Sequence, residues 1–198
     1  MRSVDGCSVN WVRVLYMDDI VRQAMAKWPN VPDCYGWLGL DARGHWYMRD
    51  DGAQARGSFT SGVSGAKGSL LQHEKLIEFI HRNYAADERG QWYFQNGPQR
   101  VYVELEVTPW VWRISDGYAP HAQTGAVTQC QRCLCDELGR VYLLTPMGLG
   151  LVHSWDVAIV AKALDTGIWT LEEAHAAELP VQFGFVQSPA MSQQALHK

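Results

Sequence analysis

A short pattern that occurs three times is the feature that most restricts how this chain can fold. It reads Asp-x-x-Gly-x-(Trp or Val)-Tyr-apolar, and its copies begin at Asp41, Asp87 and Asp136. The Asp can accept backbone hydrogen bonds within a turn, the Gly can adopt a positive φ, and the aromatic and β-branched residues that follow favour a strand. Each copy therefore predicts the corner of a β-hairpin. Three such matches also indicate an internal repeat.

Hydrophobic periodicity predicts the elements around these corners. Ser69 and Thr170 begin capping-box patterns, Ser69-Leu-Leu-Gln72 and Thr170-Leu-Glu-Glu173, which favour helix starts. The combination of hairpin strands and helices predicts an α+β protein with a mainly antiparallel sheet, built from repeated hairpin-plus-helix motifs. The predicted strands are 37–40, 46–48, 99–107, 110–114, 126–134 and 140–145, and the predicted helices are 18–28, 69–84, 154–165 and a short one from Leu171.

The same signals divide the chain into four parts. We expect an N-terminal helical segment at 1–32, a first α+β unit at 33–116 and a second α+β unit at 117–188. Residues 189–198 have the composition of a flexible tail.

Composition narrows the class of protein. With 47% hydrophobic and 19% charged residues among 198, the chain is globular. Its net charge is −4 and its 17 Lys and Arg residues are scattered, which argues against a nucleic-acid partner. No apolar run reaches the ~20 residues of a membrane span, and acidic residues stand where a signal peptide would be apolar. Five cysteines, an odd number, favour reduced thiols. We expect a soluble, cytoplasmic protein with no membrane partner.

Several of these segments resemble a known family. The helix segment Glu74-Lys75-Leu76-Ile77, the strand Trp92-Tyr93-Phe94 and the corner Val107-Thr108-Pro109-Trp110 are similar to motifs of domain-of-unknown-function family 1285, a group of uncharacterised proteobacterial proteins. The resemblance covers roughly residues 35–115. A long loop at 49–68 and a cysteine cluster depart from that family's pattern, so a sibling uncharacterised family fits equally. The resemblance implies a fold of repeated strand and helix motifs and a role in ligand sensing or signalling.

The glycine-rich loop at 57–68 suggests a phosphate site at first reading. A P-loop needs its lysine directly after the second glycine, but Lys67 precedes Gly68 and is separated from Gly65 by an alanine. The strand before it is also a hairpin strand. We interpret the loop as a mobile connection that ends in a helix cap.

Cys130, Cys133 and Cys135 form the pattern Cys-x-x-Cys-x-Cys. Three thiolates could hold zinc or a soft metal if His121, His153 or Cys34 supplied a fourth ligand. In an extended strand, however, Cys130 would point to the face opposite the other two. No helix begins there to lower a thiol pKa for redox chemistry. Structural thiols are the favoured interpretation, and a metal-dependent enzyme stays the alternative.

Other candidate catalytic groups lack the required patterns. Glu104 and Glu106 share one face of a strand, as the polar side of an alternating strand does. His73 and His81 lack a His-Glu-x-x-His frame, and no Gly-x-Ser-x-Gly sequence occurs. We therefore name no catalytic residue, no metal ligand and no cofactor.

The aromatic residues of the central strands are the remaining candidates for a functional site. They are core residues, or they line an apolar cleft or a patch that pairs two subunits. Arginines near the strand ends could bind an anionic ligand. The sequence thus predicts a non-enzymatic module that binds a small molecule or a partner, with a homodimer possible and a purely structural interaction module as a further alternative. The predicted ligand-binding residues are Trp92, Arg100, Trp110, Trp112 and Arg113.

Overall fold

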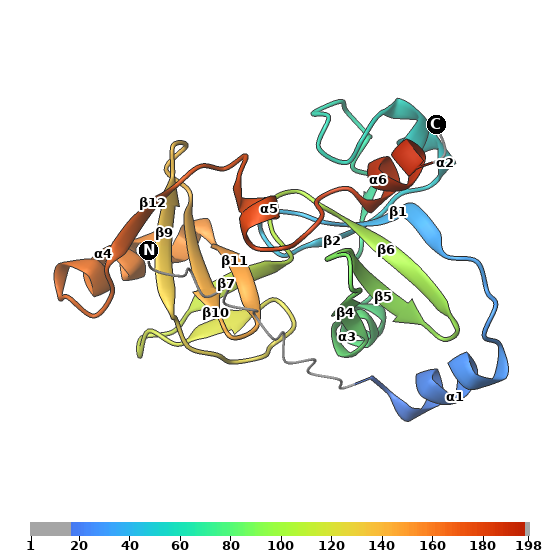
Figure 1. Cartoon of the computed structure of the whole chain (residues 1–198), viewed down its shortest axis with the longest axis horizontal. Coiled ribbons are helices and arrows are strands. Elements are labelled where there is room, and N and C mark those ends of the chain that lie inside the picture. Colours follow the sequence, from blue (N-terminus) through green and yellow to red (C-terminus); the bar gives the residue numbers. More distant parts are fainter. Residues whose placement is uncertain (1–16, 197–198) are drawn as a thin grey trace, which may run out of the picture.

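A computed structural model of the chain describes residues 17–196. It contains two six-stranded sheets with helices around them. In Figure 1 the first sheet lies on the right and the second on the left. Antiparallel neighbours outnumber parallel ones in both sheets together. The predicted α+β class with mainly antiparallel pairing is confirmed.

The first sheet has the strand order β3-β2-β1-β6-β5-β4. Strands β1 and β6 pair in parallel, and the other neighbours are antiparallel. The β5–β6 hairpin turns through Gly97 and Pro98, with Asn96 opposite Gln99. The strands are β1 (Cys34–Leu40), β2 (Trp46–Met48), β3 (Ser69–Leu70), β4 (Tyr84–Ala86), β5 (Trp92–Asn96) and β6 (Gln99–Leu105).

The second sheet has the order β12-β9-β10-β11-β7-β8. Its parallel pairs are β11–β7 and β12–β9, and its other neighbours are antiparallel. The strands are β7 (Trp110–Ile114), β8 (Pro120–Ala122), β9 (Arg132–Asp136), β10 (Val141–Thr145), β11 (Gly148–Val152) and β12 (Leu171–Ala174).

Most helices lie around the outside of the sheets in Figure 1, whereas α5 is seen between them and contributes Leu179 to the core. Helices α1 and α4 agree with the predicted segments 18–28 and 154–165. Helix α2 was not predicted; Asp50 caps it, accepting a hydrogen bond from Ala53 N at 2.8 Å. The helices are α1 (Asp19–Lys27), α2 (Asp51–Arg56), α3 (Glu74–Arg82), the 3₁₀ turn η1 (Ser154–Asp156) with α4 (Val157–Asp165), α5 (Leu179–Gln182) and α6 (Pro189–Leu196).

Helix α3 begins later than the capping box at Ser69 predicts. Ser69 lies in β3, which pairs with β2. The residue that caps α3 is His73, whose Nδ1 accepts from Leu76 N at 3.3 Å. Pairing with a neighbouring strand, a non-local interaction, therefore overrode the local helix signal.

The segment from Leu171 is also a strand, not the predicted helix. It pairs in parallel with β9, and Arg132 of β9 forms an ion pair with Glu172 at 2.6 Å. The helix predicted from the Thr170 capping box is therefore wrong.

The C-terminal residues also differ from the prediction. Residues 189–196 were expected to be part of a flexible tail, but they form α6, which lies against β6 and β1.

The three predicted corners share one geometry. In each, the Asp Oδ1 atom accepts hydrogen bonds from the N–H groups two and four residues ahead, at 2.8–3.0 Å. The Gly at the fourth position has a φ of +82°, +76° and +75° in turn. The corners join β1 to β2, β4 to β5 and β9 to β10. A hairpin at each corner is thus confirmed, while a longer internal repeat stays a prediction.

Two further turns follow the same backbone path without the Asp. At 115–119 and 122–126, the first residue's N–H donates to the carbonyl four residues ahead, and the fourth residue's N–H donates back to the first. The fourth positions are Tyr118 and Gly125, with φ of +62° and +85°. The Asp pattern therefore marks only some of the corners that the fold uses.

One hydrophobic core runs through both sheets. Its middle is aromatic: Tyr84 packs edge-on against Trp110, and Trp92 against Trp110 at a centroid distance of 5.0 Å. The Tyr84 hydroxyl donates to Pro109 O at 3.1 Å. Because these rings come from both sheets, each sheet contributes to the stability of the other.

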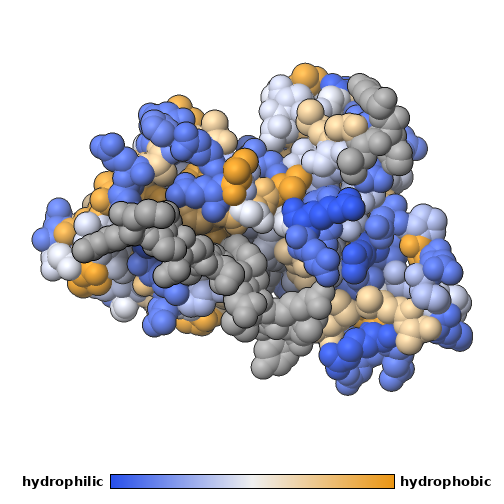
Figure 2. All heavy atoms as spheres, viewed as in Figure 1, coloured by the Kyte–Doolittle hydropathy of each residue, from blue (hydrophilic) through white to orange (hydrophobic). Residues whose placement is uncertain are grey.

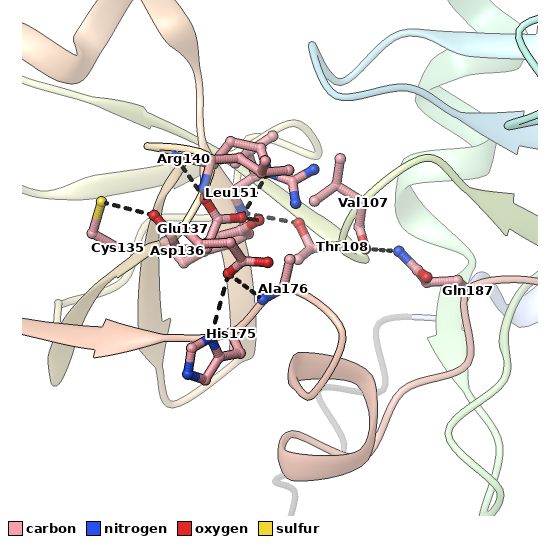
Figure 3. A network of polar contacts seen from close by, with 12 residues as sticks. Val107, Thr108, Cys135, Asp136, Glu137, Arg140, Leu151, His175, Ala176 and Gln187 are labelled. Atoms are coloured by element: carbon pink, nitrogen blue, oxygen red, sulfur yellow. Dashed lines mark hydrogen bonds and ion pairs between the residues drawn. The ribbon is translucent and has the colours of Figure 1, made fainter.

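The chain passes from one sheet to the other between Leu105 and Trp110. Thr108 links the two, since its hydroxyl oxygen accepts from Leu151 N at 2.9 Å. Figure 3 shows Gln187, from the C-terminal segment, reaching Val107, whose carbonyl accepts its side-chain amide at 3.1 Å. Strand β7, placed by sequence in the unit 33–116, thus belongs to the second sheet, and the division into units stays a prediction.

Among the described residues, no helix has both the length and the apolar character needed to cross a bilayer.

Candidate functional site

The three predicted tryptophans lie together, but inside the core. Trp112 is fully buried, and Trp92 and Trp110 are nearly so. The indole N–H of Trp110 donates to Met147 O at 2.8 Å, and that of Trp112 to Leu143 O at 3.0 Å. Their rings pack on one another and their polar atoms have partners, which is the arrangement of core residues. The geometry gives no support to a ligand between them.

The two predicted arginines lie on different sheets. Arg113, on β7, forms an ion pair with the buried Asp156 carboxylate at 2.6 Å and a second hydrogen bond at 3.1 Å. The same carboxylate accepts from Ile114 N at 2.9 Å, which fixes the end of η1 against the sheet. Arg100, on β6, has no such ion pair among the described residues. The two arginines therefore do not form one anion site.

The cysteine cluster gives no support to a metal centre. Within residues 17–196 no three His, Cys, Asp or Glu side chains gather as metal ligands would. Burial raises the pKa of Cys130 to about 11 and that of Cys133 to about 12. These thiols are therefore protonated at neutral pH, the form that neither attacks nor binds metal readily.

Glu104 and Glu106 do not form the exposed polar face expected of them. Glu104 is buried, where its carboxylate accepts from Ser188 Oγ at 2.5 Å and Ala190 N at 3.0 Å. Burial raises the Glu104 pKa, and these two hydrogen bonds oppose that shift. Glu106 accepts from Lys67 Nζ at 2.8 Å. Both carboxylates line a cavity of about 240 Å³, but they fasten α6 and the glycine-rich loop to β6.

The glycine-rich loop has a structural anchor of its own. The buried guanidinium of Arg49 donates to the carbonyls of Ala66 at 2.8 Å, Gly36 at 3.1 Å and Gly57 at 2.6 Å. Because one planar group holds both ends of the loop and strand β1, the loop is held against the sheet. The predicted mobile connection is thus fastened at 57 and 66.

A larger pocket lies between the N-terminal segment and the β5–β6 hairpin. We call residues 28–33, which join α1 to β1, the strap, and the cavity of about 570 Å³ beneath it the strap pocket. Figure 2 shows moderately hydrophobic residues beside strongly hydrophilic ones over α1. The pocket walls combine apolar and polar groups in similar measure, with one charged side chain of each sign, Asp33 and Arg100. The wall residues outside the strap are Met25, Gln95, Pro98 and Arg100.

Helix α1, which leads into the strap, and the far end of the strap are both fixed. Asp18 N donates to Asn83 Oδ1 at 3.0 Å, and Arg82 forms an ion pair with Asp18 at 3.2 Å. Val21 of α1 is buried. At the far end, Gln99 Nε2 donates to Pro32 O at 3.0 Å. Pro29 and Pro32 limit the backbone of the strap itself. These contacts fix the position of α1 and of the end of the strap next to β1.

The polar groups of the strap pocket come from one hairpin. Gln95 and Arg100 are directly opposite in the β5–β6 register, as are Tyr93 and Tyr102. Directly opposite residues share a face of the sheet, with Cβ atoms about 4.5–5.5 Å apart. The Arg100 guanidinium lies over the Tyr93 ring, 4.7 Å from its centroid. Tyr102 stacks on Tyr35 at 4.5 Å, which adds a third tyrosine to this face.

Arg100 has one acidic neighbour, Asp33 at the end of the strap. The two groups interact electrostatically, but no ion pair joins them. Burial raises the pKa of Asp33 above its usual value, and the charge of Arg100 opposes this shift. A cation and an anion thus line one pocket at a separation too large for direct pairing.

Gln95, a wall residue of the same pocket, has an unpaired hydrogen-bond acceptor that is buried away from solvent. Its side chain is fully buried, and its Nε2 donates to Gly97 O at 2.9 Å. This contact defines the amide orientation, because the reverse would set two oxygens against each other. The Oε1 atom has no donor among the described residues.

Sequence reasoning named Arg100 but missed Gln95, Asp33 and the strap. The sequence Asn96-Gly97-Pro98 marks a two-residue hairpin loop, which would place Gln95 opposite Arg100. The position of the strap has no comparable local signal, since it depends on packing between α1 and the distant helix α3.

Comparisons with known proteins point to a family of unknown function. The profile of the DUF2944 family, described as "Protein of unknown function (DUF2946)", matches residues 17–190. No curated protein matches the sequence. Among solved structures, the chain is similar to the crystal structure of a DUF1285 family protein from Silicibacter pomeroyi. The two are 10% identical with a TM-score of 0.45, over 67% of this chain and 72% of that one.

The resemblance predicted from the sequence, to family 1285 or a sibling uncharacterised family, is confirmed as a resemblance to a family of unknown function, because the matching profile is that of such a family. Because the profile match spans most of its length, this chain belongs to the DUF2944 family of proteins of unknown function.

Proposed function

We propose that this protein is a non-enzymatic module that binds a small molecule with an anionic group in the strap pocket, and that Arg100 is the anchor for that group. A guanidinium presents several N–H donors in a plane and binds carboxylate or phosphate oxygens in pairs. The proposal keeps Arg100 from the predicted ligand-binding residues and leaves the buried tryptophans to the core.

The observation that carries the proposal is the setting of Arg100. Arg100 lines a cavity of about 570 Å³ whose walls are part apolar and part polar, and it has no ion-pair partner among the described residues. By contrast, Arg113 and Arg132 each pair with a carboxylate at 2.6 Å. A cation that is half-buried beside apolar walls gains more from an anionic ligand than a fully hydrated one does.

The walls favour a small organic molecule over a bare ion. Met25, Val31 and Pro98 supply apolar surface, and the ring of Trp28 is 52% exposed beside them. Such surface gains free energy when an apolar group covers it, at about 25 cal/mol per Å². The alternative, a metal-dependent enzyme that uses Cys130, Cys133 and Cys135, has no comparable support, because among the described residues these thiols are not part of any group of potential metal ligands.

Isothermal titration calorimetry tests the proposal with three probes: inorganic phosphate, 3-phenylpropanoate and L-phenylalanine. We expect at least one to bind, and Arg100→Met to weaken its affinity about tenfold or more, the usual value of a charge-assisted hydrogen bond. Methionine keeps an aliphatic stem over Tyr93. The matched control is Arg56→Met, which removes an exposed arginine from α2. Equal binding by the Arg100→Met protein, or no binding of any probe, contradicts the proposal.

A further inference from the structure

We infer that Tyr93 is a positioning residue of the strap pocket: its ring fixes the Arg100 guanidinium in the place from which this group binds an anion. The inference rests on the proposed function and adds the residue that prepares the anchor before a ligand arrives. It follows from a change of partners at the second hairpin corner. There Tyr102 takes the place beside the corner Asp that the repeated pattern gives to its own tyrosine elsewhere.

The corner pattern places a tyrosine in the strand that follows each Asp. These tyrosines are Tyr47, Tyr93 and Tyr142. In the third corner the Tyr142 hydroxyl donates to Asp136 Oδ2 at 2.8 Å. In the first corner, burial and the neighbouring Asp41 carboxylate both raise the pKa of Tyr47. In two of the corners, the tyrosine of the pattern therefore lies beside its own Asp.

The second corner differs from the other two. Asp87 Oδ2 accepts from the hydroxyl of Tyr102 at 3.2 Å, and Tyr102 lies on β6, directly opposite Tyr93. Tyr102 is held there by its stack on Tyr35, with ring centroids 4.5 Å apart. Burial raises the pKa of Tyr102, so its hydroxyl keeps the proton that it donates. Because Tyr102 satisfies Asp87, the ring of Tyr93 is left to the Arg100 guanidinium, 4.7 Å from its centroid.

This contact restricts Arg100 at the pocket wall. Arg100 is opposite Gln95, which makes it a diagonal neighbour of Tyr93 across the β5–β6 hairpin, within reach of a long side chain. Tyr93 is itself buried, so its ring offers the guanidinium a fixed surface. Ordering a free arginine on binding costs about 0.5–1.5 kcal/mol. An arginine that already lies over a fixed ring avoids part of this cost, which is the role we assign to Tyr93.

Calorimetry with 3-phenylpropanoate and inorganic phosphate tests the inference. We expect Tyr93→Leu to weaken the binding of these anions about threefold to tenfold, and Tyr93→Phe, which keeps the ring, to retain it. In the Arg100→Met background Tyr93→Leu should have no further effect, since Tyr93 acts through Arg100. The matched control is Tyr47→Leu, because Tyr47 has the same place in the first corner and a cation, Lys67 Nζ, 5.8 Å from its ring centroid. It should leave the affinity unchanged.

NMR of the Arg100 side chain provides a second measurement that needs no ligand. Its Nε–H and Cδ–H signals are assigned by their loss in Arg100→Met. We expect the Tyr93 ring to shift these signals upfield in the wild-type protein and in Tyr93→Phe, and the shift to vanish in Tyr93→Leu. If Tyr93→Leu does not fold, Tyr93→Met, which also removes the ring, replaces it.

The outcomes separate the inference from the proposed function. Arg100 signals that keep their positions in Tyr93→Leu overturn the inference, whether or not an anion binds. A loss of affinity that persists in the Arg100→Met background also overturns it, since Tyr93 would then act on the pocket by another route. If neither anion binds the wild-type protein although the signals shift as expected, the proposed function fails, and the binding role of Tyr93 fails with it.

Discussion

Gln95 and Arg100 stand opposite each other across the β5–β6 hairpin, where Arg100 is a half-buried wall residue of the strap pocket and the unpaired amide oxygen of Gln95 is buried. The pair lies on the face of the first sheet away from the core, since the intervening Phe94 and Val101 pack with the core cluster. A position that makes the ligand-free protein less stable than it could be is a mark of a functional site. The first prediction concerns the free energy of unfolding that the unpaired Gln95 oxygen costs.

Gln95→Leu should change the stability of the ligand-free protein by less than about 1 kcal/mol, because it removes one hydrogen bond and one unpaired buried oxygen together. Gln123→Leu is the matched control: its amide accepts from Val111 N at 2.9 Å and donates to Pro109 O at 3.0 Å. Its loss should cost about 2–3 kcal/mol, since Val111 N then has no partner. Urea unfolding measures both. Equal losses for the two variants would mean that Gln95 is satisfied in solution.

Gly90 and Gly139 occupy the same position in two hairpin corners, with φ of +76° and +75°. Gly139→Ala meets open space and should cost only about 1 kcal/mol for the left-handed backbone. At Gly90 an added Cβ would also overlap the Gly184 carbonyl, so Gly90→Ala should cost about 2–4 kcal/mol. The measurement is the difference in unfolding free energy between the two variants. Indistinguishable values would show that the segment around Gly184 does not pack on this corner.

Arg49→Lys should loosen the glycine-rich loop, because an ammonium group cannot reach three carbonyls in a plane. We expect a loss of about 2–4 kcal/mol, as for a broken buried network. Faster tryptic cleavage after Lys67 should accompany it. Arg43→Lys, at an exposed position of the first corner, is the control for both assays. Unchanged cleavage after Lys67 would refute the anchoring role.

The features that sequence reasoning predicted correctly are the local ones. A corner such as Asp136–Arg140 is determined by the side chain and backbone of its own residues, so its pattern can be read directly. Helix α1 has the same local character. The structure keeps these local preferences because no contact with a distant segment competes with them.

The wrong predictions arise where contacts with segments distant in the sequence determine the local structure. The capping box at Thr170 was overridden by pairing of β12 with β9 and by the Arg132–Glu172 ion pair. The alternation of Trp110 and Trp112 shows which face they share, but not that the first sheet covers this face. Glu104 was expected on an outward face for the same reason, and α6 buries it. The strap pocket needs two such distant contacts at once, so only Arg100 was foreseen.

Trp46 and His81 provide a prediction on pH. The Trp46 indole N–H donates to His81 Nε2 at 2.9 Å, which requires a neutral imidazole, and burial lowers the pKa of His81 to about 4. The unfolded chain, with a histidine pKa near 6.5, binds the proton more readily. The stabilising contribution is therefore complete above pH 6.5 and is lost as the pH falls from 6.5 toward 4, with a slope of at most about 1.4 kcal/mol per pH unit.

His81→Gln isolates this contribution, because glutamine can accept the Trp46 N–H without titrating between pH 4 and 6.5. We expect the wild-type protein to lose unfolding free energy more steeply than His81→Gln over this window, and the two curves to run parallel above pH 7. Urea unfolding at half-unit pH intervals measures both. The carboxylates titrate in both proteins, so the difference between the curves reports His81 alone. Curves that stay parallel down to pH 4 would mean that the imidazole is not held neutral by Trp46, and the packing of α3 on β2 would then need another explanation.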